Sequence, residues 1–485
     1  MLFTSLEFLF AFLPVALAVN FLLPKKLRNY WLLLASLFFY AWGEPRFVLA
    51  MLLSILMNDL MARWIHRVSL PAEDGPQRVR ALRVRKALLT AAILLNLSLL
   101  FLFKYTNFAT ATLRAWFPML KDTVPQTSFV LPIGISFFTF QAMSYVIDVY
   151  RGVPLQRNIA NVGLYISLFP QLIAGPIVRY TTVAEELKHR TVTFEGFSQG
   201  VLRFLYGFNK KMLLANILAK AADAAFASST LSTGMAWLGM VCYTLQIFFD
   251  FAGYSEMAIG LGQMLGFRFL ENFHDPYISK TVTEFWRRWH ISLGSWFKDY
   301  LYFPLGGSRV SSRLRLVFNL AVVWLATGIW HGANWTFLLW GVWHGAIIIV
   351  EKLLELPRRL PQSRAASAVY QGFTLLAVML GWVLFRAEDL GAALYYLKAL
   401  FGLGGAGLFC DTAAFYLREY LVPLAVGILC STPIFRRLRE RLEQRGDRAA
   451  FCAQLAAGTV QLLLFLVGVS YLVINAHNPF IYFNF

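Results

Sequence analysis

The chain has 485 residues, of which 58% are hydrophobic and only 14% are charged. In a soluble domain about a quarter of all residues are charged, so this composition excludes an ordinary soluble enzyme. The formal net charge of +18 is spread over short segments between apolar runs, which favours membrane topology over nucleic-acid binding. The apolar runs recur along the whole chain and predict an all-α polytopic integral membrane protein.

The N-terminal part of the chain is expected to start with a membrane helix. Residues 6–23 are apolar, with no basic segment before them and no evident cleavage site, so we expect a retained helix rather than a signal peptide. Residues 30–42 and 47–64 predict a hairpin of two short helices. Residues 65–86 contain proline, glycine and a basic cluster and predict a long cytoplasmic loop, after which residues 87–103 cross outward.

Two apolar segments in the middle of the chain, residues 131–152 and 161–180, are interrupted by proline and glycine. They also carry serine, threonine and glutamine at membrane depth. Irregular backbone is tolerated there only where it is buried in protein or lines a cavity. These segments therefore predict broken or re-entrant helices around a cavity.

The basic loops set the expected orientation of the helices. The positive-inside rule assigns six clusters to the cytoplasm: Lys25–Arg28, Arg63–Arg67, Arg78–Lys86, Arg309–Arg315, Arg358–Arg364 and Arg436–Arg448. The helices expected between residues 316 and 474 alternate across the membrane with these loops. At about 20 residues per span, we expect roughly ten or eleven spans in one membrane domain over residues 1–485.

The strongest chemical signal lies in residues 271–345, the expected catalytic centre, where three of the seven histidines each follow a tryptophan. His331 ends an apolar run and precedes Gly-Ala-Asn, so it lies where a membrane helix ends. An ionisable group at membrane depth is by default a functional-site hypothesis, and imidazole suits a general base at neutral pH. The structural alternative for His331 is a hydrogen bond between helices. His290 and His344 are the other two histidines of this stretch. His344 either faces the same polar chamber inside the membrane protein as His331, or it only packs against its neighbours.

A helix expected over residues 283–302 places His290 on one face with Trp286. Five basic side chains are candidate contacts for the phosphate groups of an anionic donor: Arg287, Arg288, Lys298, Lys210 and Lys211. The alternative is that these are interfacial residues whose charged ends reach the membrane surface.

The four cysteines, Cys242, Cys410, Cys430 and Cys452, lie in or beside apolar runs without paired spacing. We therefore expect buried thiols rather than disulfides. Neither His290 nor His331 has a cysteine or histidine at zinc-ligand spacing, so no metal site is expected.

Several segments carry a resemblance to one family. WRRWHISLGSWFKDYLYFPLGG, WLATGIWHGANWTFLLWG and ENFHDPYIS lie in the central stretch, and YAWGEP, LPIGISFFTFQAMSYVIDVYRG, LFPQLIAGPIVRY and NPFIYF extend the likeness over nearly the full length. The chain resembles the membrane-bound O-acyltransferase superfamily, and within it the bacterial alginate O-acetyltransferase-like branch. By this resemblance His331 is the essential histidine of the WHGANW segment, His290 is the upstream histidine, and His344 belongs to the second Trp-His-Gly.

The resemblance implies a helical bundle around a central tunnel in the bacterial inner membrane. It implies acetyl-coenzyme A as the donor, no bound cofactor and no nucleic acid. Beyond membrane lipid, the implied partners are a polysaccharide and a periplasmic acetyltransferase, either of which carries the acceptor hydroxyl. His331 would act as a general base or a transient acyl carrier, and His290 would position the thioester or polarise its carbonyl.

Two alternatives stay open at the level of sequence. A transporter for glycan or lipid also uses polar groups in broken helices, and D-alanyl transfer to teichoic acid is a second reaction within the same family. Consumption of donor in step with acceptor modification distinguishes an acyltransferase from a transporter.

Overall fold

The computed structural model describes residues 1–72, 74–356, 363–474 and 478–481, and within these ranges the chain is helical, with no named strand. Its contacts divide it into two compact units: residues 1–201 with 258–270, and residues 202–257 with 271–485. Helix α12 (Thr233–Met264) runs from the second unit into the first. The single membrane domain over residues 1–485 stays a prediction. Arg358, Arg359, Tyr482 and Phe483 of the segments quoted above lie outside the described residues.

Eight helices of the described chain are long and apolar enough to cross a membrane. They are α3 (Val48–Arg67), the stretch formed by α4 (Pro76–Leu100), η2 (Phe101–Tyr105) and α5 (Thr106–Trp116), then α12, α15 (Arg313–His331), α16 (Trp335–Leu353), α18 (Arg364–Arg386), α20 (Asp411–Cys430) and α22 (Asp447–Val473). Two shorter apolar stretches are η1 (Phe8–Phe12) with α1 (Leu13–Leu22), and α19 (Leu390–Leu400). The all-α polytopic class is confirmed, with eight long helices and shorter apolar pieces where roughly ten or eleven spans were expected.

The first unit contains the broken helices expected in the middle of the chain. It holds α2 (Lys25–Gly43), η3 (Pro118–Leu120), α6 (Ile135–Tyr150), α7 (Ile159–Ser167), α8 (Phe169–Leu172), α9 (Tyr180–Val183) and the start of α10 (Phe194–Asn209). Gly134 precedes α6 with φ +76°, and a Cβ there would lie 2.8 Å from the Leu172 carbonyl oxygen, so only glycine fits. Thr139 and Gln141 of α6 are buried. These pieces therefore face protein rather than lipid.

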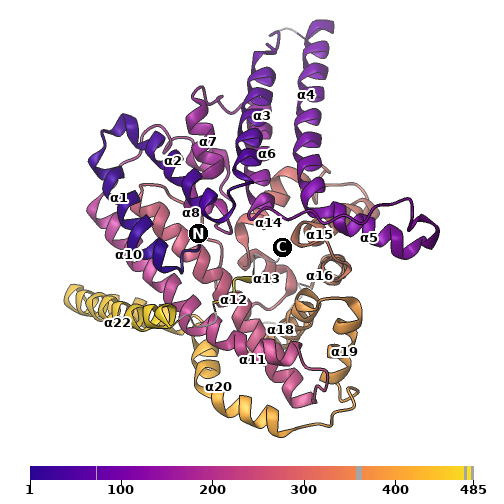
Figure 1. Ribbon diagram of the computed structural model, residues 1–485, viewed down its shortest axis with the longest axis vertical. Helices are drawn as coiled ribbons and strands as arrows, with labels where there is room; N and C mark the ends of the chain where they lie inside the picture. The colour runs from indigo at the N-terminus through magenta and orange to yellow at the C-terminus, as the bar shows by residue number, and fades with distance from the viewer. Residues whose placement is uncertain (73, 357–362, 475–477, 482–485) are drawn as a thin grey trace. The chain divides into compact units, whose positions relative to one another are not determined.

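The second unit holds the expected catalytic centre. Its further elements are η4 (Lys210–Ala215), α11 (Asn216–Phe226), η5 (Pro276–Ile278), α13 (Val282–Arg288), α14 (Ile291–Phe297), η6 (Lys298–Tyr302) and α21 (Ile434–Glu443). Helices α15 and α16 form a hairpin packed through glycine (Figure 1). A Cβ on Gly328 would lie 2.6 Å from the Phe337 carbonyl oxygen, and one on Gly341 would lie 2.6 Å from that of Trp324. Small residues let membrane helices approach closely, and this hairpin carries two of the three central histidines.

All four cysteines are free thiols, and only Cys242 is buried. Cys410 and Cys430 are half-buried and Cys452 is exposed, so the expectation of buried thiols is wrong for these three. Cys452 belongs to α22, whose apolar window is only 6% buried inside the protein. An apolar run in a membrane protein faces either the core or lipid, and its composition does not distinguish the two.

Candidate active site

The start of α13 is fixed by side chains from two elements. Thr281 accepts a hydrogen bond from the Glu284 amide at 3.0 Å, and Glu284 accepts one from the Lys280 amide at 2.9 Å. Glu351 of α16 accepts from the first two amides of α13 at 2.7 and 2.8 Å. A carboxylate at a helix N-terminus satisfies free amides and is favoured by the helix dipole. Helix α16 therefore positions α13 directly.

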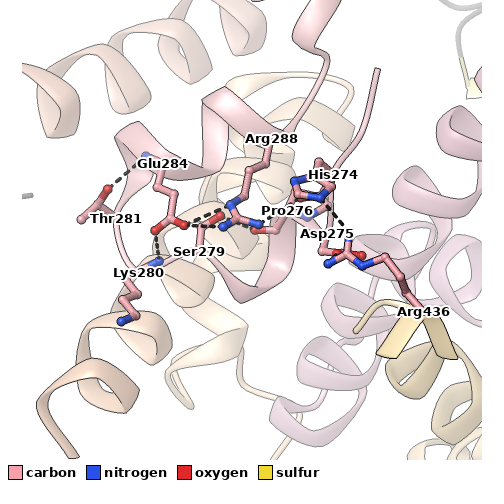
Figure 2. Close-up of polar contacts among 9 residues, drawn as sticks. All are labelled: His274, Asp275, Pro276, Ser279, Lys280, Thr281, Glu284, Arg288 and Arg436. Carbon is pink, nitrogen blue, oxygen red and sulfur yellow. Dashed lines mark hydrogen bonds and ion pairs between the residues drawn. The ribbon is translucent and has the colours of Figure 1, made fainter. Parts of the chain in front are cut away.

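The segment before α13 is tied back to the end of that helix (Figure 2). Arg288 pairs with Glu284 at 2.8 Å and donates to the His274 carbonyl at 3.3 Å. The His274 amide donates to the Arg288 carbonyl at 2.9 Å, and Phe273 forms an antiparallel bridge with Trp289. Arg288 thus holds this segment in place.

The expectation of one continuous helix over residues 283–302 is wrong. Helix α13 ends at Arg288 and α14 begins at Ile291, with His290 between them at φ +46°. A residue in the left-handed region does not continue a right-handed helix. The break takes His290 out of helical register, and its ring lies 4.6 Å from the ring of Phe251 on α12.

His290 is 1% exposed and is held by Asn272. The Asn272 Oδ1 atom lies 3.2 Å from His290 Nδ1 and also accepts from the Ser292 amide at 3.1 Å and the Ser292 hydroxyl at 2.9 Å. The two Ser292 donors identify this atom as the amide oxygen, which only accepts. The proton of a neutral His290 ring therefore sits on Nδ1, and Nε2 presents a lone pair with no hydrogen-bond partner among the described residues.

Burial keeps His290 in this neutral form. The residue lies outside the eight candidate spans, and burial lowers its pKa to about 3. A buried cation without a counter-charge is costly, so the ring stays uncharged near neutral pH. A neutral imidazole with an open Nε2 accepts a hydrogen bond or a proton.

His331 ends α15 beside His290. The centroids of the two imidazole rings are 6.5 Å apart, and His331 is 3% exposed. Its ring packs edge-on against Trp340 at 4.9 Å and Phe385 at 5.3 Å. The loop that follows is fixed because Asn334 caps α16 and donates to the Glu388 carbonyl at 2.7 Å. The structure thus brings the two predicted histidines into one aromatic enclosure.

His344 contacts Trp340, which also packs against His331. Its ring centroid is 5.1 Å from that of Trp286 and 5.3 Å from that of Trp340. Among the described residues neither ring nitrogen has a hydrogen-bond partner, and a Cβ on Gly381 would lie 2.5 Å from Nε2. His344 therefore supports the tryptophans that surround the other two histidines.

A cavity of about 350 Å³ opens beside His290. It is lined by Thr283, Trp286, Arg287, His290, Ile291, Leu293, Gly294, Ser295, Phe297, Lys298, Val323, Trp324, Thr327 and Ile348. Two of the five predicted cations, Arg287 and Lys298, line it together with His290. His331 and His344 do not line the cavity themselves. The ring of His331 lies beside that of His290, and the ring of His344 lies beside that of Trp286, and both of these partners line the cavity.

The structure does not bring Lys210 and Lys211 to this cavity. Lys210 pairs with Glu256 at 2.6 Å. Lys211 is buried and pairs with Asp250 at 2.5 Å, and it also donates to the Pro479 carbonyl at 2.5 Å. These lysines stabilise the packing of η4 against α12 and the C-terminal segment.

Three residues of this site were not predicted from the sequence. Asn272 orients His290, Glu351 caps α13, and Phe385 covers His331 from α18. Asn272 lies within the ENFHDPYIS segment, so its place in a motif was a usable signal. No local sequence signal pointed to Glu351 or Phe385, because each lies on a helix that is distant in sequence from the residue it contacts.

The sequence model of the membrane-bound O-acyltransferase family matches residues 86–387. This match includes α13 to α18, the two central histidines and the cavity. The chain therefore belongs to the membrane-bound O-acyltransferase family and is an acyltransferase. Among the described residues no group of three histidine, cysteine or acidic side chains is placed to hold a metal ion.

Three relatives narrow the comparison within the family. The chain is 39% identical over 513 aligned positions to a protein of Azotobacter vinelandii described as "Probable alginate O-acetylase AlgI", with both chains covered completely. It is 39% identical over 501 positions to the protein of Pseudomonas putida with the same description, again over both full lengths. It is 31% identical over 531 positions to the "Peptidoglycan O-acetyltransferase" of Helicobacter pylori, covering all of this chain and 98% of the other. The resemblance to the alginate O-acetyltransferase-like branch is confirmed.

Proposed function

We propose that this protein moves acetyl groups from acetyl-coenzyme A at the cytoplasmic face of the bacterial inner membrane to an acceptor at the outer face, for O-acetylation of an alginate-like exopolysaccharide. The observation that carries this proposal is the pairing of His290 and His331 in one enclosure, beside a cavity lined by Arg287 and Lys298. The names of the full-length relatives favour acetyl over D-alanyl as the group that is transferred.

The cavity has features that suit the donor. Its volume of about 350 Å³ falls in the range of about 300–1,000 Å³ that is usual for small-molecule sites. Its walls are mainly apolar, which fits the acetyl group and the pantetheine arm, while Arg287 and Lys298 fit the phosphate groups. Arg287 and Lys298 line the same cavity as His290, so a donor whose phosphate groups bind them has its pantetheine arm beside that histidine.

A second cavity offers a route for the acceptor. It has a volume of about 570 Å³ and is lined by residues of α11, the following loop, α18 and α19, among them Asp223, Arg386 and Tyr395. Arg386 directly follows Phe385, whose ring lies 5.3 Å from that of His331. The positive-inside assignment places these ends of α15 and α18 on the outer side. We assign this cavity to the acceptor, with Phe385 between it and His331.

The chemistry assigned to the two histidines follows from their positions. His331 takes the proton from the acceptor hydroxyl, and the hydroxyl oxygen attacks the thioester carbonyl carbon. The tetrahedral intermediate collapses, the C–S bond breaks, and the thiolate takes the proton back from His331. His290 carries its proton on Nδ1, toward Asn272, so its Nε2 accepts. We therefore assign His290 to positioning the donor, by accepting a hydrogen bond from an amide of its pantetheine arm, rather than to polarising the carbonyl, which needs a hydrogen-bond donor.

The partner that carries the acceptor is a periplasmic acetyltransferase that passes the acetyl group to the polysaccharide, or the polysaccharide itself. Both present a hydroxyl, and the route through the second cavity serves either. Extracts with and without periplasmic proteins, supplied to the same reconstituted protein, separate the two.

The experiment that tests the proposal is release or transfer of radiolabelled acetyl from acetyl-coenzyme A by the protein in proteoliposomes. His331→Ala is compared with His66→Ala, the same change at an exposed histidine on α3. We expect label to be handled by the wild type and by His66→Ala and lost in a folded His331→Ala. Equal handling by all three proteins contradicts the assigned role of His331. If none of the three proteins releases or transfers label with acceptor extract present, the assignment of acetyl-coenzyme A as the donor is contradicted.

A further inference from the structure

Helix α21 carries an exposed apolar stripe at one end of two candidate membrane spans. It connects α20 to α22, and the positive-inside rule places it in the cytoplasm. Ile434, Phe435 and Leu438 are 47%, 56% and 51% exposed. At 100° per residue these side chains, with the half-buried Leu442, fall within one face of the helix.

Arginines border this stripe on both sides. Arg437 and Arg441 lie along one edge and Arg439 along the other, and all three are exposed. Glu440 falls on the opposite face. An apolar stripe between basic side chains is the pattern of a helix that lies in the interface of an anionic membrane. The arginine stems cover apolar surface while their charged ends meet headgroups.

The opposite face of α21 is joined to the catalytic segment (Figure 2). Arg436 approaches His274 Nε2 at 2.7 Å and pairs with Asp275 at 2.6 Å. A guanidinium only donates hydrogen bonds, so His274 Nε2 is the acceptor here. Asp275 has φ +45°, a conformation that a non-glycine residue keeps only where its surroundings fix it.

From this contact the path to His290 is short. The amide of His274 bonds the carbonyl of Arg288, and Phe273 bridges Trp289. The next residue back is Asn272, which holds His290 Nδ1. A displacement of α21 therefore acts on a hydrogen-bonded segment whose other end sets the orientation of the imidazole.

We propose that α21 binds anionic phospholipid headgroups and that this binding, through Arg436, stabilises the position of Asn272 and His290. The occupant is the headgroup layer, because the charges that flank the stripe are cationic and the helix lies between two membrane spans. The effect on turnover rests on the proposed function; the lipid binding does not.

The lipid binding is tested by hydrogen–deuterium exchange of the full-length protein in nanodiscs. Discs of phosphatidylcholine alone are compared with discs that also contain phosphatidylglycerol. We expect slower exchange of the α21 amides with phosphatidylglycerol, and a loss of that protection in Arg437→Gln/Arg441→Gln. Each of these two arginines beside the stripe, when removed, weakens binding about fivefold. The matched control is Arg80→Gln/Arg83→Gln, two arginines of α4, which keeps the protection of α21.

Three results overturn the lipid proposal. They are equal exchange of α21 in both lipids, equal protection in the double variant, and protection that appears only when two copies of the chain share a disc. The last result assigns the stripe to a second copy of this chain.

The coupling is tested by acetyl-coenzyme A turnover in the same discs. We expect faster turnover with phosphatidylglycerol for the wild type. Arg436→Gln keeps the exchange protection of α21 and loses the stimulation, because the stripe remains and the contact to His274 and Asp275 does not. Stimulation that survives in Arg436→Gln overturns the coupling. No turnover by the wild type in either lipid contradicts the proposed function, and the exchange result still decides the lipid binding.

Discussion

Replacing Asn272 tests whether the orientation of His290 is set by one side chain. Asn272→Leu removes the acceptor of three hydrogen bonds, from His290 Nδ1 and from the amide and hydroxyl of Ser292. A buried donor left without an acceptor costs about 1–3 kcal/mol, so we expect the loss of the acceptor for three donors to lower the free energy of unfolding by at least about 3 kcal/mol. The ring also loses a bias of about 1 kcal/mol toward Nδ1–H, which changes the tautomer ratio about fivefold and lowers kcat by at most that factor.

Asn272→Asp separates orientation from stability. The carboxylate still accepts from Nδ1, so the ring keeps its direction, but the opposite charge raises the pKa of His290 from its present value of about 3. The neutral ring is the active form. We therefore expect turnover to decline as pH falls through the raised pKa, whereas His290 imposes no such decline on the wild type above about pH 4.

The assay is the pH dependence of kcat for acetyl-coenzyme A turnover in proteoliposomes, with thermal unfolding of each variant measured alongside. Ser292→Ala is the matched control, because it removes one donor to Asn272 and leaves the bond to His290. We expect it to keep the wild-type pH profile. An acid limb shared by Asn272→Asp and the wild type, while both remain folded, contradicts this role of Asn272.

Lys298→Gln is expected to raise the KM for acetyl-coenzyme A about tenfold with little change in kcat, since Lys298 lines the cavity; steady-state kinetics measure this. Arg288→Gln is expected to lower the melting temperature instead, because it loses the pair with Glu284; thermal unfolding measures this. Gly328→Val is expected to separate α15 from α16, because a Cβ there would lie 2.6 Å from a backbone oxygen; a melting temperature equal to the wild type contradicts this packing. Lys211→Met leaves the buried Asp250 unpaired and is expected to lower the free energy of unfolding by about 3–5 kcal/mol. Denaturant unfolding in detergent measures that loss, and a change under about 1 kcal/mol contradicts it.

The class of protein and the place of His331 followed from local sequence. Apolar runs report membrane helices directly, because every backbone polar group in lipid must be bonded within the protein. His331 was placed correctly at a helix end because Gly-Ala-Asn follows it, and Asn334 indeed caps the next helix. Features of this kind depend on neighbours a few residues apart.

The roles of the cations did not follow from sequence. Arg287 and Arg288 are adjacent, but one lines the cavity and the other bonds Glu284 and His274, because neighbours on a helix point about 100° apart. Lys211 is 39 residues from the partner that buries it, Asp250. Long-range pairs of this kind have no local pattern, and neither does the left-handed break at His290, which replaced an expected helical residue.

The sidedness of the reaction tests most directly whether acetyl passes, at the site of His290 and His331, from a donor at one face of the membrane to an acceptor at the other. Proteoliposomes with the protein in one orientation receive radiolabelled acetyl-coenzyme A at the cytoplasmic face and acceptor extract at the other. We expect labelled acceptor on the far side, at a rate that His331→Ala abolishes and His66→Ala does not change. Label that stays on the side of the donor, or transfer that persists without His331, contradicts this expectation.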